Sequence, residues 1–127
     1  MRRLTTRAHG LLDYPLGLLL IASPWLFGFH DGAIDTWLAV AAGAAVLGLS
    51  LFTDYEGGLV PRLPTSVHLG LDVGLGVLLA VAPFAVGLDH RAWGPYLLIG
   101  ATLVGAALVT DPEPSRSRLA ARAAVRR

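Results

Sequence analysis

The sequence contains no cysteine and no lysine, and it has little charge of either sign. Without cysteine the chain has no disulfide framework, no thiolate metal site and no dithiol redox centre. Only 15% of its residues are charged and 54% are hydrophobic, with a mean hydropathy of +0.62. These values are untypical of a soluble domain. The all-arginine basic residues, together with abundant Ala, Gly and Leu, indicate a GC-rich coding sequence and a bacterial source.

Familiar catalytic and nucleotide-binding motifs are also missing. No serine pairs with a base at a recognisable spacing, and the glycines of GLDVGLG lie inside an apolar run instead of a phosphate-binding loop. The basic C-terminal tail has no aromatic residue, which argues against a nucleic-acid partner. The sequence therefore favours a protein without enzymatic activity and with no catalytic residues.

Four long apolar runs dominate the chain. A helix needs about 20 residues to cross a bilayer, and each run is near that length. We predict transmembrane helices at about 9–29, 34–53, 66–88 and 93–110, with Thr6 and Thr65 as N-caps of the first and third. A signal peptide is the alternative for the first run, but the same pattern recurs in mid-chain, where no signal peptide lies. The short connectors predict two helical hairpins.

The two halves of the chain resemble each other. HGLLDYPLGLLLIASPWLFGF (9–29) aligns with HLGLDVGLGVLLAVAPFAVGL (68–88) at an offset of 59 residues, and the offset falls to 57 in the second helix of each hairpin. The sequence thus predicts a tandem repeat of a two-helix unit, with a pseudo-two-fold axis along the membrane normal. We divide the chain into a first repeat (1–54), a linker (55–65), a second repeat (66–111) and a basic tail (112–127).

Arginine placement predicts the orientation of the helices. Most arginines precede the first helix, lie in the linker or follow the fourth helix, and Arg91 alone lies on the other side. We therefore expect a multi-pass protein of the bacterial inner membrane with both termini in the cytoplasm. Asp54 and Asp111 end helices on that side, and Arg7 or Arg62 are their expected partners. The tail is either a disordered basic segment or an interfacial helix on anionic lipid.

The chain resembles the SPW-repeat family of small membrane proteins. The resemblance rests on Ser23-Pro24-Trp25 in the first apolar run, followed by Gly28, and it extends over most of the chain from Thr6 to Asp111. The second copy reads Ala82-Pro83-Phe84, followed by Gly87, and so keeps only the proline, an aromatic residue and the glycine. The resemblance implies an integral membrane protein with two-helix units, and it supplies no activity to carry over to this chain. Because the copies share a Pro–aromatic–Gly ending, we interpret it as a structural helix terminus at the outer face.

Two histidines and two aspartates are the candidate site. His9 and Asp13 are four residues apart, as are His68 and Asp72, so each pair shares a helix face. We call these four residues the tetrad and expect them to meet inside the bundle. The leading interpretation is a hydrogen-bonded cluster that joins the two repeats. The alternatives are a divalent metal site, haem ligation by His9 and His68, and proton or ion transport.

Glycines at repeated positions predict close helix packing. They are Gly17, Gly43, Gly48, Gly76, Gly100 and Gly105. Gly70 and Gly74 form a GxxxG pattern that serves either packing within the chain or dimerisation. The sequence favours a structural or accessory subunit that packs in the lipid bilayer against copies of itself or a larger membrane complex. The alternatives are a proton or ion transporter that uses the tetrad, and a haem- or quinone-binding redox subunit.

Overall fold

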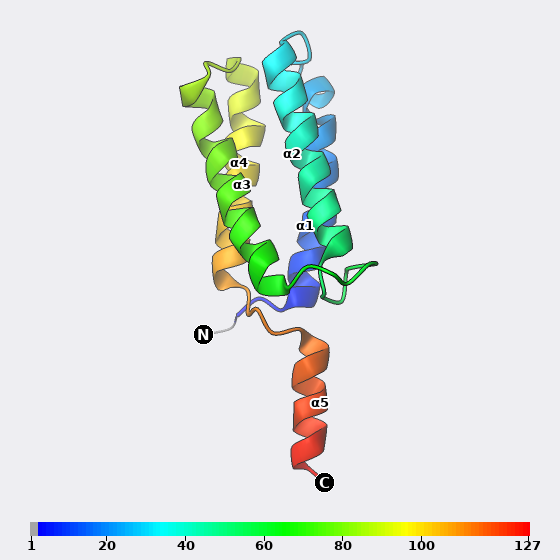
Figure 1. Cartoon of the computed structure of the whole chain (residues 1–127). Helices are drawn as coiled ribbons and strands as arrows, with labels where there is room; N and C mark the ends of the chain where they lie inside the picture. Colours follow the sequence, from blue (N-terminus) through cyan, green and yellow to red (C-terminus); the bar gives the residue numbers. More distant parts are fainter. Residues whose placement is uncertain (1–2) are drawn as a thin grey trace.

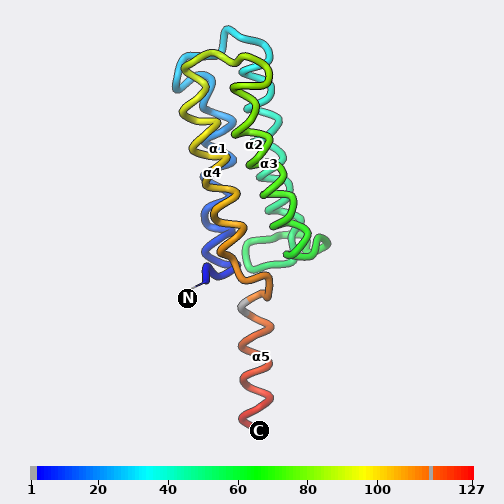
Figure 2. The backbone as a smooth tube through the Cα atoms, turned by 90° about the vertical axis from the view of Figure 1, so that its left-hand side faces the viewer, coloured from blue at the N-terminus to red at the C-terminus, as the bar shows by residue number. Residues whose placement is uncertain are grey.

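The structure is a computed structural model that describes residues 3–127. Arg2, one of the arginines that precede the first predicted helix, lies outside the described residues. The fold is all-α. Helices α1 (Thr6–Leu26) and α2 (Ala33–Phe52) form one hairpin, and α3 (Thr65–Ala85) and α4 (His90–Val109) form a second (Figure 1). The hairpins stand side by side as a four-helix bundle. A fifth helix, α5 (Ser115–Val125), extends away from the end of the bundle at which α1 begins and α4 ends (Figures 1 and 2).

Glycine sets the ends of α1 and α3. Gly28 and Gly87 have φ angles of +71° and +67°, a conformation that glycine adopts without the steric cost of a Cβ atom. The Phe27 N–H donates to the Ser23 carbonyl at 2.9 Å and closes the last turn of α1. Both helices therefore end before the predicted limits of 29 and 88, and Pro24 lies within the final turn of α1 instead of ending it.

Local capping sets the starts of the helices. Thr5, not Thr6, is the N-cap of α1, and its hydroxyl accepts a hydrogen bond from the Ala8 N–H at 3.2 Å. The N-cap of α3 is Pro64, so Thr65 is likewise the first helical residue. The Asp89 side chain caps α4 and makes it begin three residues before the predicted start at 93. The predicted N-caps were wrong by one residue in both cases.

Each hairpin is packed through a pair of glycines. A Cβ atom on Gly43 would lie 2.6 Å from the Gly17 carbonyl oxygen, and one on Gly100 would lie 2.6 Å from that of Gly76. The backbones of α1 and α2, and of α3 and α4, therefore touch at these points, and any side chain would separate them.

Other glycines face open space. No atom lies within 4 Å of a Cβ built on Gly48, Gly105, Gly70 or Gly74. The predicted packing role of Gly48 and Gly105 thus finds no neighbour within this chain. The Gly70–Gly74 pattern likewise finds no neighbour within the chain, so packing within the chain is not its role here.

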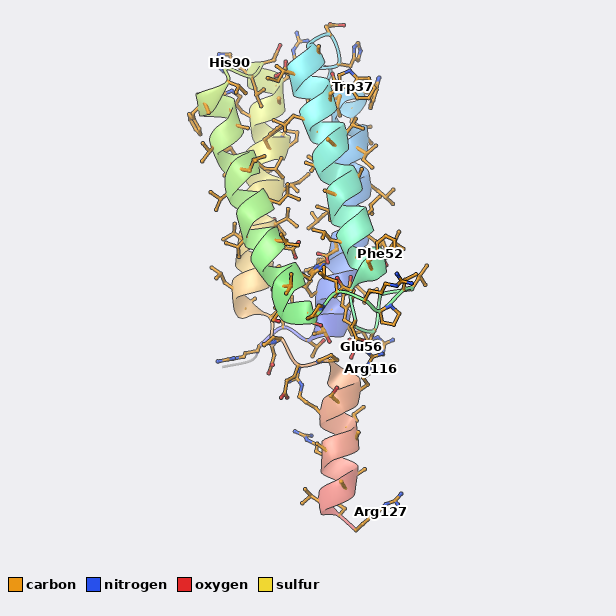
Figure 3. All side chains as sticks on the ribbon, in the orientation of Figure 1. Trp37, Phe52, Glu56, His90, Arg116 and Arg127 are labelled. Atoms are coloured by element: carbon orange, nitrogen blue, oxygen red, sulfur yellow. The ribbon has the colours of Figure 1, made fainter. Side chains whose placement is uncertain are left out.

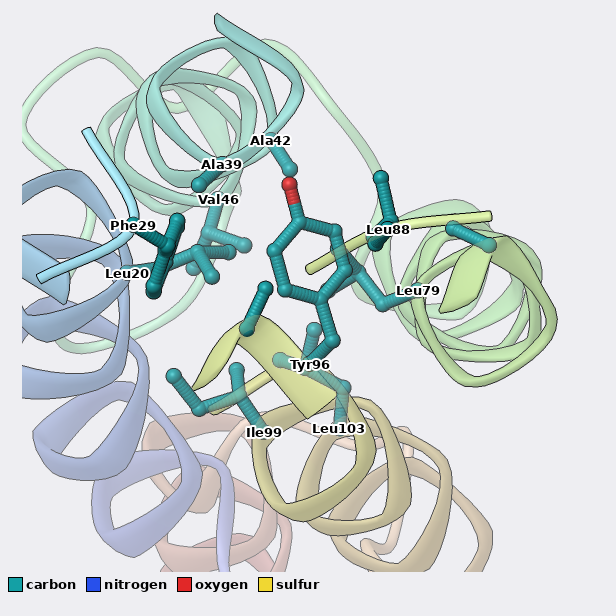
Figure 4. Close-up of a cluster of buried hydrophobic side chains, with 12 residues drawn as sticks. Leu20, Phe29, Ala39, Ala42, Val46, Leu79, Leu88, Tyr96, Ile99 and Leu103 are labelled. Atoms are coloured by element: carbon teal, nitrogen blue, oxygen red, sulfur yellow. The ribbon is translucent and has the colours of Figure 1, made fainter. Parts of the chain in front are cut away.

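The two hairpins meet mainly along α1 and α4, with fewer contacts between α2 and α3. Tyr96 of α4 lies at the centre of the apolar core between the hairpins, and its hydroxyl points toward α2 (Figure 4). The hydroxyl donates to the Asp35 carbonyl oxygen at 2.6 Å. The core also contains Leu20, Phe29, Ala39, Ala42, Val46, Leu79, Ala82, Leu88, Ala92, Ile99 and Leu103. Most of these residues lie in the half of the bundle that is farther from α5.

The surface of the bundle is apolar where a soluble protein would be polar. Among the described residues, α2, α3 and α4 are long and apolar enough to cross a membrane. Helix α1 is as long as α3 but carries Arg7, His9 and Asp13. Large side chains that point outward include Leu11, Leu18, Trp37, Val77 and Leu98, each at least 49% exposed. An apolar exterior around buried polar groups indicates a membrane protein.

Acidic residues at the helix ends pair with the tail. Arg116 forms an ion pair with Asp54, and Arg118 forms one with Asp111 at 3.0 Å. The expected partners, Arg7 and Arg62, were therefore wrong, because α5 brings its own arginines beneath both helix ends (Figure 3). The tail segment is helical over Ser115–Val125 and not disordered, and it leaves the bundle instead of lying against its side (Figure 1).

Candidate functional site

The four residues of the tetrad lie together at the end of the bundle nearer to α5. Helix α1 supplies His9 and Asp13, and α3 supplies the other two. Each side chain is at most 1% exposed. Asp13 is seven residues into α1, which is about 10 Å along a helix. The stripe of polar residues on each helix thus turns inward, away from the apolar exterior.

Two hydrogen bonds of the tetrad cross from one hairpin to the other. His9 Nε2 lies 2.9 Å from Asp72 Oδ2, and His68 Nε2 lies 3.1 Å from Asp13 Oδ2. The contacts within each helix are 3.4 Å for the α1 pair and 3.0 Å for the α3 pair. Each imidazole therefore contacts both carboxylates. The two rings are edge to face, with centroids 5.5 Å apart.

Two threonines fix which ring nitrogen of each histidine carries a proton. The Thr53 hydroxyl donates to the Leu49 carbonyl at 2.6 Å and lies 2.8 Å from His68 Nδ1. A hydroxyl has one proton, so Thr53 accepts from the Nδ1–H of His68. Thr110 donates to the Ala106 carbonyl and accepts from His9 Nδ1 at 2.9 Å in the same way. Both histidines thus direct Nε2 at the carboxylates.

A serine makes the two aspartates unequal. Ser50 donates to Asp13 Oδ2 at 3.0 Å, whereas the position 57 residues later is Ala107, which has no hydroxyl. Asp72 Oδ2 instead lies within hydrogen-bond distance of both histidine Nε2 atoms. The Oδ1 atoms of Asp13 and Asp72 are buried and accept no hydrogen bond. Buried oxygens without a partner are unusual and costly.

The linker covers the tetrad on one side. Tyr55 is 2% exposed and its ring centroid lies 5.6 Å from that of His68. Burial raises the pKa of Tyr55, so its phenol stays protonated. Two hydrogen bonds hold the linker against α1, from Thr6 to the Glu56 carboxylate and from Tyr14 to the Gly57 carbonyl, each at 2.5 Å. The linker therefore covers the α5 end of the bundle beside the tetrad and shields the tetrad from solvent.

The Ser-Pro-Trp stretch lies at the other end of α1. The buried Ser23 hydroxyl donates to the Leu20 carbonyl of its own helix at 2.7 Å. Trp25 is 58% exposed and its counterpart Phe84 is 64% exposed. Pro83 is buried in the last turn of α3 as Pro24 is in α1. The tetrad lies near the start of α1 and the Ser-Pro-Trp stretch at its end, so the two are separate regions of the bundle.

The structure places segments of the two hairpins in matching positions. Leu4, before α1, exchanges backbone hydrogen bonds with Val109, the last residue of α4, and Asp111 beyond it. Leu63, before α3, does the same with Phe52, the last residue of α2, and Asp54 beyond it. These segments correspond under the sequence offsets of 59 and 57. An SPW repeat domain matches residues 7–110 of the chain. The chain belongs to the SPW repeat family.

Membership of the SPW repeat family confirms the resemblance inferred from Ser23-Pro24-Trp25 and agrees with a membrane protein. The match covers both halves of the tetrad and ends before α5. The comparisons with curated proteins and with solved structures found no match.

Sequence reasoning found the tetrad but not the residues around it. Thr53 and Thr110 orient the histidines, Ser50 binds Asp13, and Tyr55 covers His68. A signal for the threonines was present, because Thr53-Asp54 aligns with Thr110-Asp111 between the repeats. No such signal exists for Ser50 and Tyr55, whose aligned positions hold Ala107 and Pro112.

Proposed function

We propose that this SPW repeat protein is a non-enzymatic structural subunit of the membrane, in which the tetrad fastens two tandem hairpins into one packing unit. The observation that carries the proposal is the exchange of partners across the hairpins, with His9 on Asp72 and His68 on Asp13. Such a crossed set of buried contacts joins the hairpins and leaves no side chain of the tetrad at the surface. Polar contacts of this kind fix the packing of membrane helices.

All four helices of the bundle cross the membrane in this proposal. Helix α1 has the length of α3, directs Leu11 and Leu18 outward and keeps His9 and Asp13 inside. Polar residues that face the bundle are compatible with a spanning helix. The two hairpins are then tandem repeats related by a pseudo-two-fold axis along the membrane normal, as the matching contacts of Leu4 and Leu63 suggest.

The termini face the cytoplasm of a bacterial inner membrane in this proposal, because the arginines gather at that end of the bundle. The absence of natural cysteine makes the orientation testable with single cysteines. Asp31→Cys, at the outer hairpin tip, should react with a membrane-impermeant maleimide in intact cells. Glu113→Cys should react only after the membrane is permeabilised. The reverse pattern would contradict the orientation. Labelling of both or neither in intact cells would contradict the three crossings, by α2, α3 and α4, that separate the two positions.

The α2–α3 face supports a packing role. Apolar hollows run along this face and are lined by Ile34, Leu38, Ala45, Leu49, Gly70, Leu71, Gly74, Val77 and Leu78, among others. Helices α2 and α3 contact each other less than α1 and α4 do. Gly70 and Gly74 present bare backbone there, which suits close approach of another transmembrane helix. The partner in this proposal is a second copy of the chain or a helix of a larger membrane complex.

Cysteine cross-linking tests the packing role. Gly74→Cys, on the open face, should cross-link to a second copy or to another membrane protein under mild oxidation in native membranes. Gly105→Cys is the matched control, since it is an exposed glycine on α4 with equally open space. Equal cross-linking at both sites, or none at either, would contradict the assigned face.

A flux measurement tests the transporter alternative. Proton flux into proteoliposomes that is present with wild type and disappears in Asp13→Asn would contradict a purely structural role.

A further inference from the structure

The tetrad brings four metal-ligating side chains to one point inside the bundle. One ligand atom from each of His9, Asp13, His68 and Asp72 lies within 4.8 Å of the other three. Two imidazole nitrogens and two carboxylate oxygens are a ligand set that Zn²⁺ uses in proteins. We propose that the tetrad is a binding site for one Zn²⁺ ion. The proposal deepens the fastening role proposed above, since the same four residues join the hairpins.

The orientation of the histidines supports a metal site. Metal-binding histidines direct one ring nitrogen at the ion and donate the other N–H to a second group, which holds the ring in place. Thr110 and Thr53 are those second groups here, and they fix Nδ1 as the protonated nitrogen of His9 and His68. An Nε2 lone pair aimed at a carboxylate is repulsive, so each Nε2 carries either a proton or a metal cation.

The unpartnered carboxylate oxygens are the independent observation. Asp13 Oδ1 and Asp72 Oδ1 are fully buried and accept no hydrogen bond. Asp13 Oδ1 lies 3.4 Å from His9 Nε2, an ion-pair contact without a hydrogen bond. A proton on Nε2 satisfies one oxygen of a carboxylate at a time. A cation at the centre attracts both oxygens of each carboxylate, and so removes the cost of the two unpartnered atoms.

The histidine–aspartate distances are close to the ligand spacing around a small four-coordinate ion. Bonds of about 2.0–2.2 Å to nitrogen and oxygen give a tetrahedron with edges of about 3.3–3.5 Å. The four histidine–aspartate distances are 2.9, 3.0, 3.1 and 3.4 Å, close to these edges, with the longest to Asp13 Oδ1 and the others to Oδ2 atoms. The four ligand atoms together lie within 4.8 Å of one another, so the side chains draw closer when they bind the ion. A porphyrin does not fit, because both Nε2 atoms lie within 3.0 Å of the same Asp72 oxygen. The tetrad therefore favours a single ion over haem.

Charge balance favours a divalent ion. Two carboxylates and two neutral imidazoles carry a charge of −2, which one Zn²⁺ cancels, as a buried site requires. With both Nε2 atoms protonated, the tetrad is also neutral. Binding of the ion thus exchanges two protons, one from each Nε2, for two positive charges. Hard cations such as Mg²⁺ and Ca²⁺ prefer sites made of oxygen ligands and should not compete.

Metal titration of the purified full-length chain tests the site. The protein is purified in mild detergent with a histidine-free tag, treated with a chelator and titrated with ZnCl₂ or CoCl₂. We expect one Zn²⁺ per chain, the visible absorption of four-coordinate Co²⁺, and a higher unfolding temperature with Zn²⁺ but not with MgCl₂. His9→Gln and His68→Gln should lose stoichiometric binding. His30→Gln and His90→Gln, at the far hairpin tips, are the matched controls and should retain it.

A second-sphere variant keeps the test decisive if the histidine variants do not fold. Thr53→Val removes the acceptor of the His68 Nδ1–H, together with a local hydrogen bond to the Leu49 carbonyl, and should weaken Zn²⁺ binding about 10–100-fold. Folded wild-type protein that binds no Zn²⁺, or Thr53→Val with unchanged affinity, would overturn the metal site. If only the metal site is wrong, wild type binds no Zn²⁺, but Asp72→Asn is still less stable than wild type in metal-free protein. If only the fastening role is wrong, wild type binds one Zn²⁺, but Asp72→Asn is as stable as wild type in metal-free protein.

Discussion

The contacts within each hairpin and the contacts between the hairpins use different chemistry. Within a hairpin, paired glycines bring two backbones together, as at Gly17–Gly43 and Gly76–Gly100. Between the hairpins, the contact is polar at the α5 end, through the tetrad, and largely apolar toward the hairpin tips, around Tyr96. Lipid tails are as apolar as leucine, so neither interface gains much from burial of apolar surface. Close packing therefore defines the hairpin, and hydrogen bonds define how two hairpins join.

Substitutions in the contact between the hairpins should lower the free energy of unfolding the most. Asp72→Asn removes a buried charge that contacts both histidines, and breaking a buried ion pair costs about 3–5 kcal/mol. Asp13→Asn should cost less, because Ser50 still has an acceptor on the side chain. The measurement is the free energy of unfolding in SDS-titrated mixed micelles, with and without chelator. Asp31→Asn is the control, since that side chain is 89% exposed. If Asp72→Asn were as stable as wild type, the tetrad would not contribute to joining the two hairpins.

The next effect is expected within the hairpins. Gly43→Ala and Gly100→Ala place a Cβ 2.6 Å from a backbone oxygen that has no freedom to move, which should destabilise the protein by about 1–3 kcal/mol. Gly48→Ala and Gly105→Ala lie on the same two helices in open space. They should be neutral or stabilising by up to about 1 kcal/mol, because alanine favours a helix over glycine. The same unfolding assay gives both values. If Gly48→Ala lowered the free energy of unfolding as much as Gly43→Ala, the close contact between Gly17 and Gly43 would not explain the effect.

The difference between these interfaces explains what the sequence predicted. Packing within a hairpin follows helical spacing, so the stripe of His9, Asp13 and Gly17 identified the inner face of its helix. The partners across the hairpins do not follow spacing. His9 binds Asp72, 63 residues away, more closely than Asp13, four residues away. Which carboxylate each imidazole meets depends on how the two hairpins rest on each other, and no local pattern encodes that.

The surroundings of the tetrad were harder still to predict. Tyr55 covers His68 because the linker turns back under the bundle, and Arg116 meets Asp54 because α5 begins there. Both contacts come from segments that the repeat does not contain, so the comparison of the two halves carried no information about them. Helix ends were predictable to within a few residues, and the positive φ of Gly28 and Gly87 accounts for much of the difference.

Tyr96 tests the contact between the hairpins at the end far from α5. Tyr96→Phe removes one hydrogen bond, to the Asp35 carbonyl, and keeps the ring in the core. The expected cost is about 0.5–1.5 kcal/mol, smaller than that of the tetrad variants because no charge is left unpaired. Tyr14→Phe is the control within the first hairpin, where the hydroxyl binds the Gly57 carbonyl of the linker near the surface. A Tyr96→Phe cost as large as that of Asp72→Asn would show that the hairpins are joined equally at both ends.

The smallest effect is expected at the Ser-Pro-Trp stretch. The Ser23 hydroxyl binds only the Leu20 carbonyl of its own helix, and the second hairpin has Ala82 at the same place and still forms α3 to Ala85. Ser23→Ala should therefore change the free energy of unfolding by about 0.5 kcal/mol, the lower end for a hydrogen bond. Ala82→Ser is the reciprocal control and should be equally mild. A Ser23→Ala cost above that of Tyr96→Phe would mean that this hydroxyl takes part in joining the hairpins, a role that the structure assigns to Tyr96 and the tetrad.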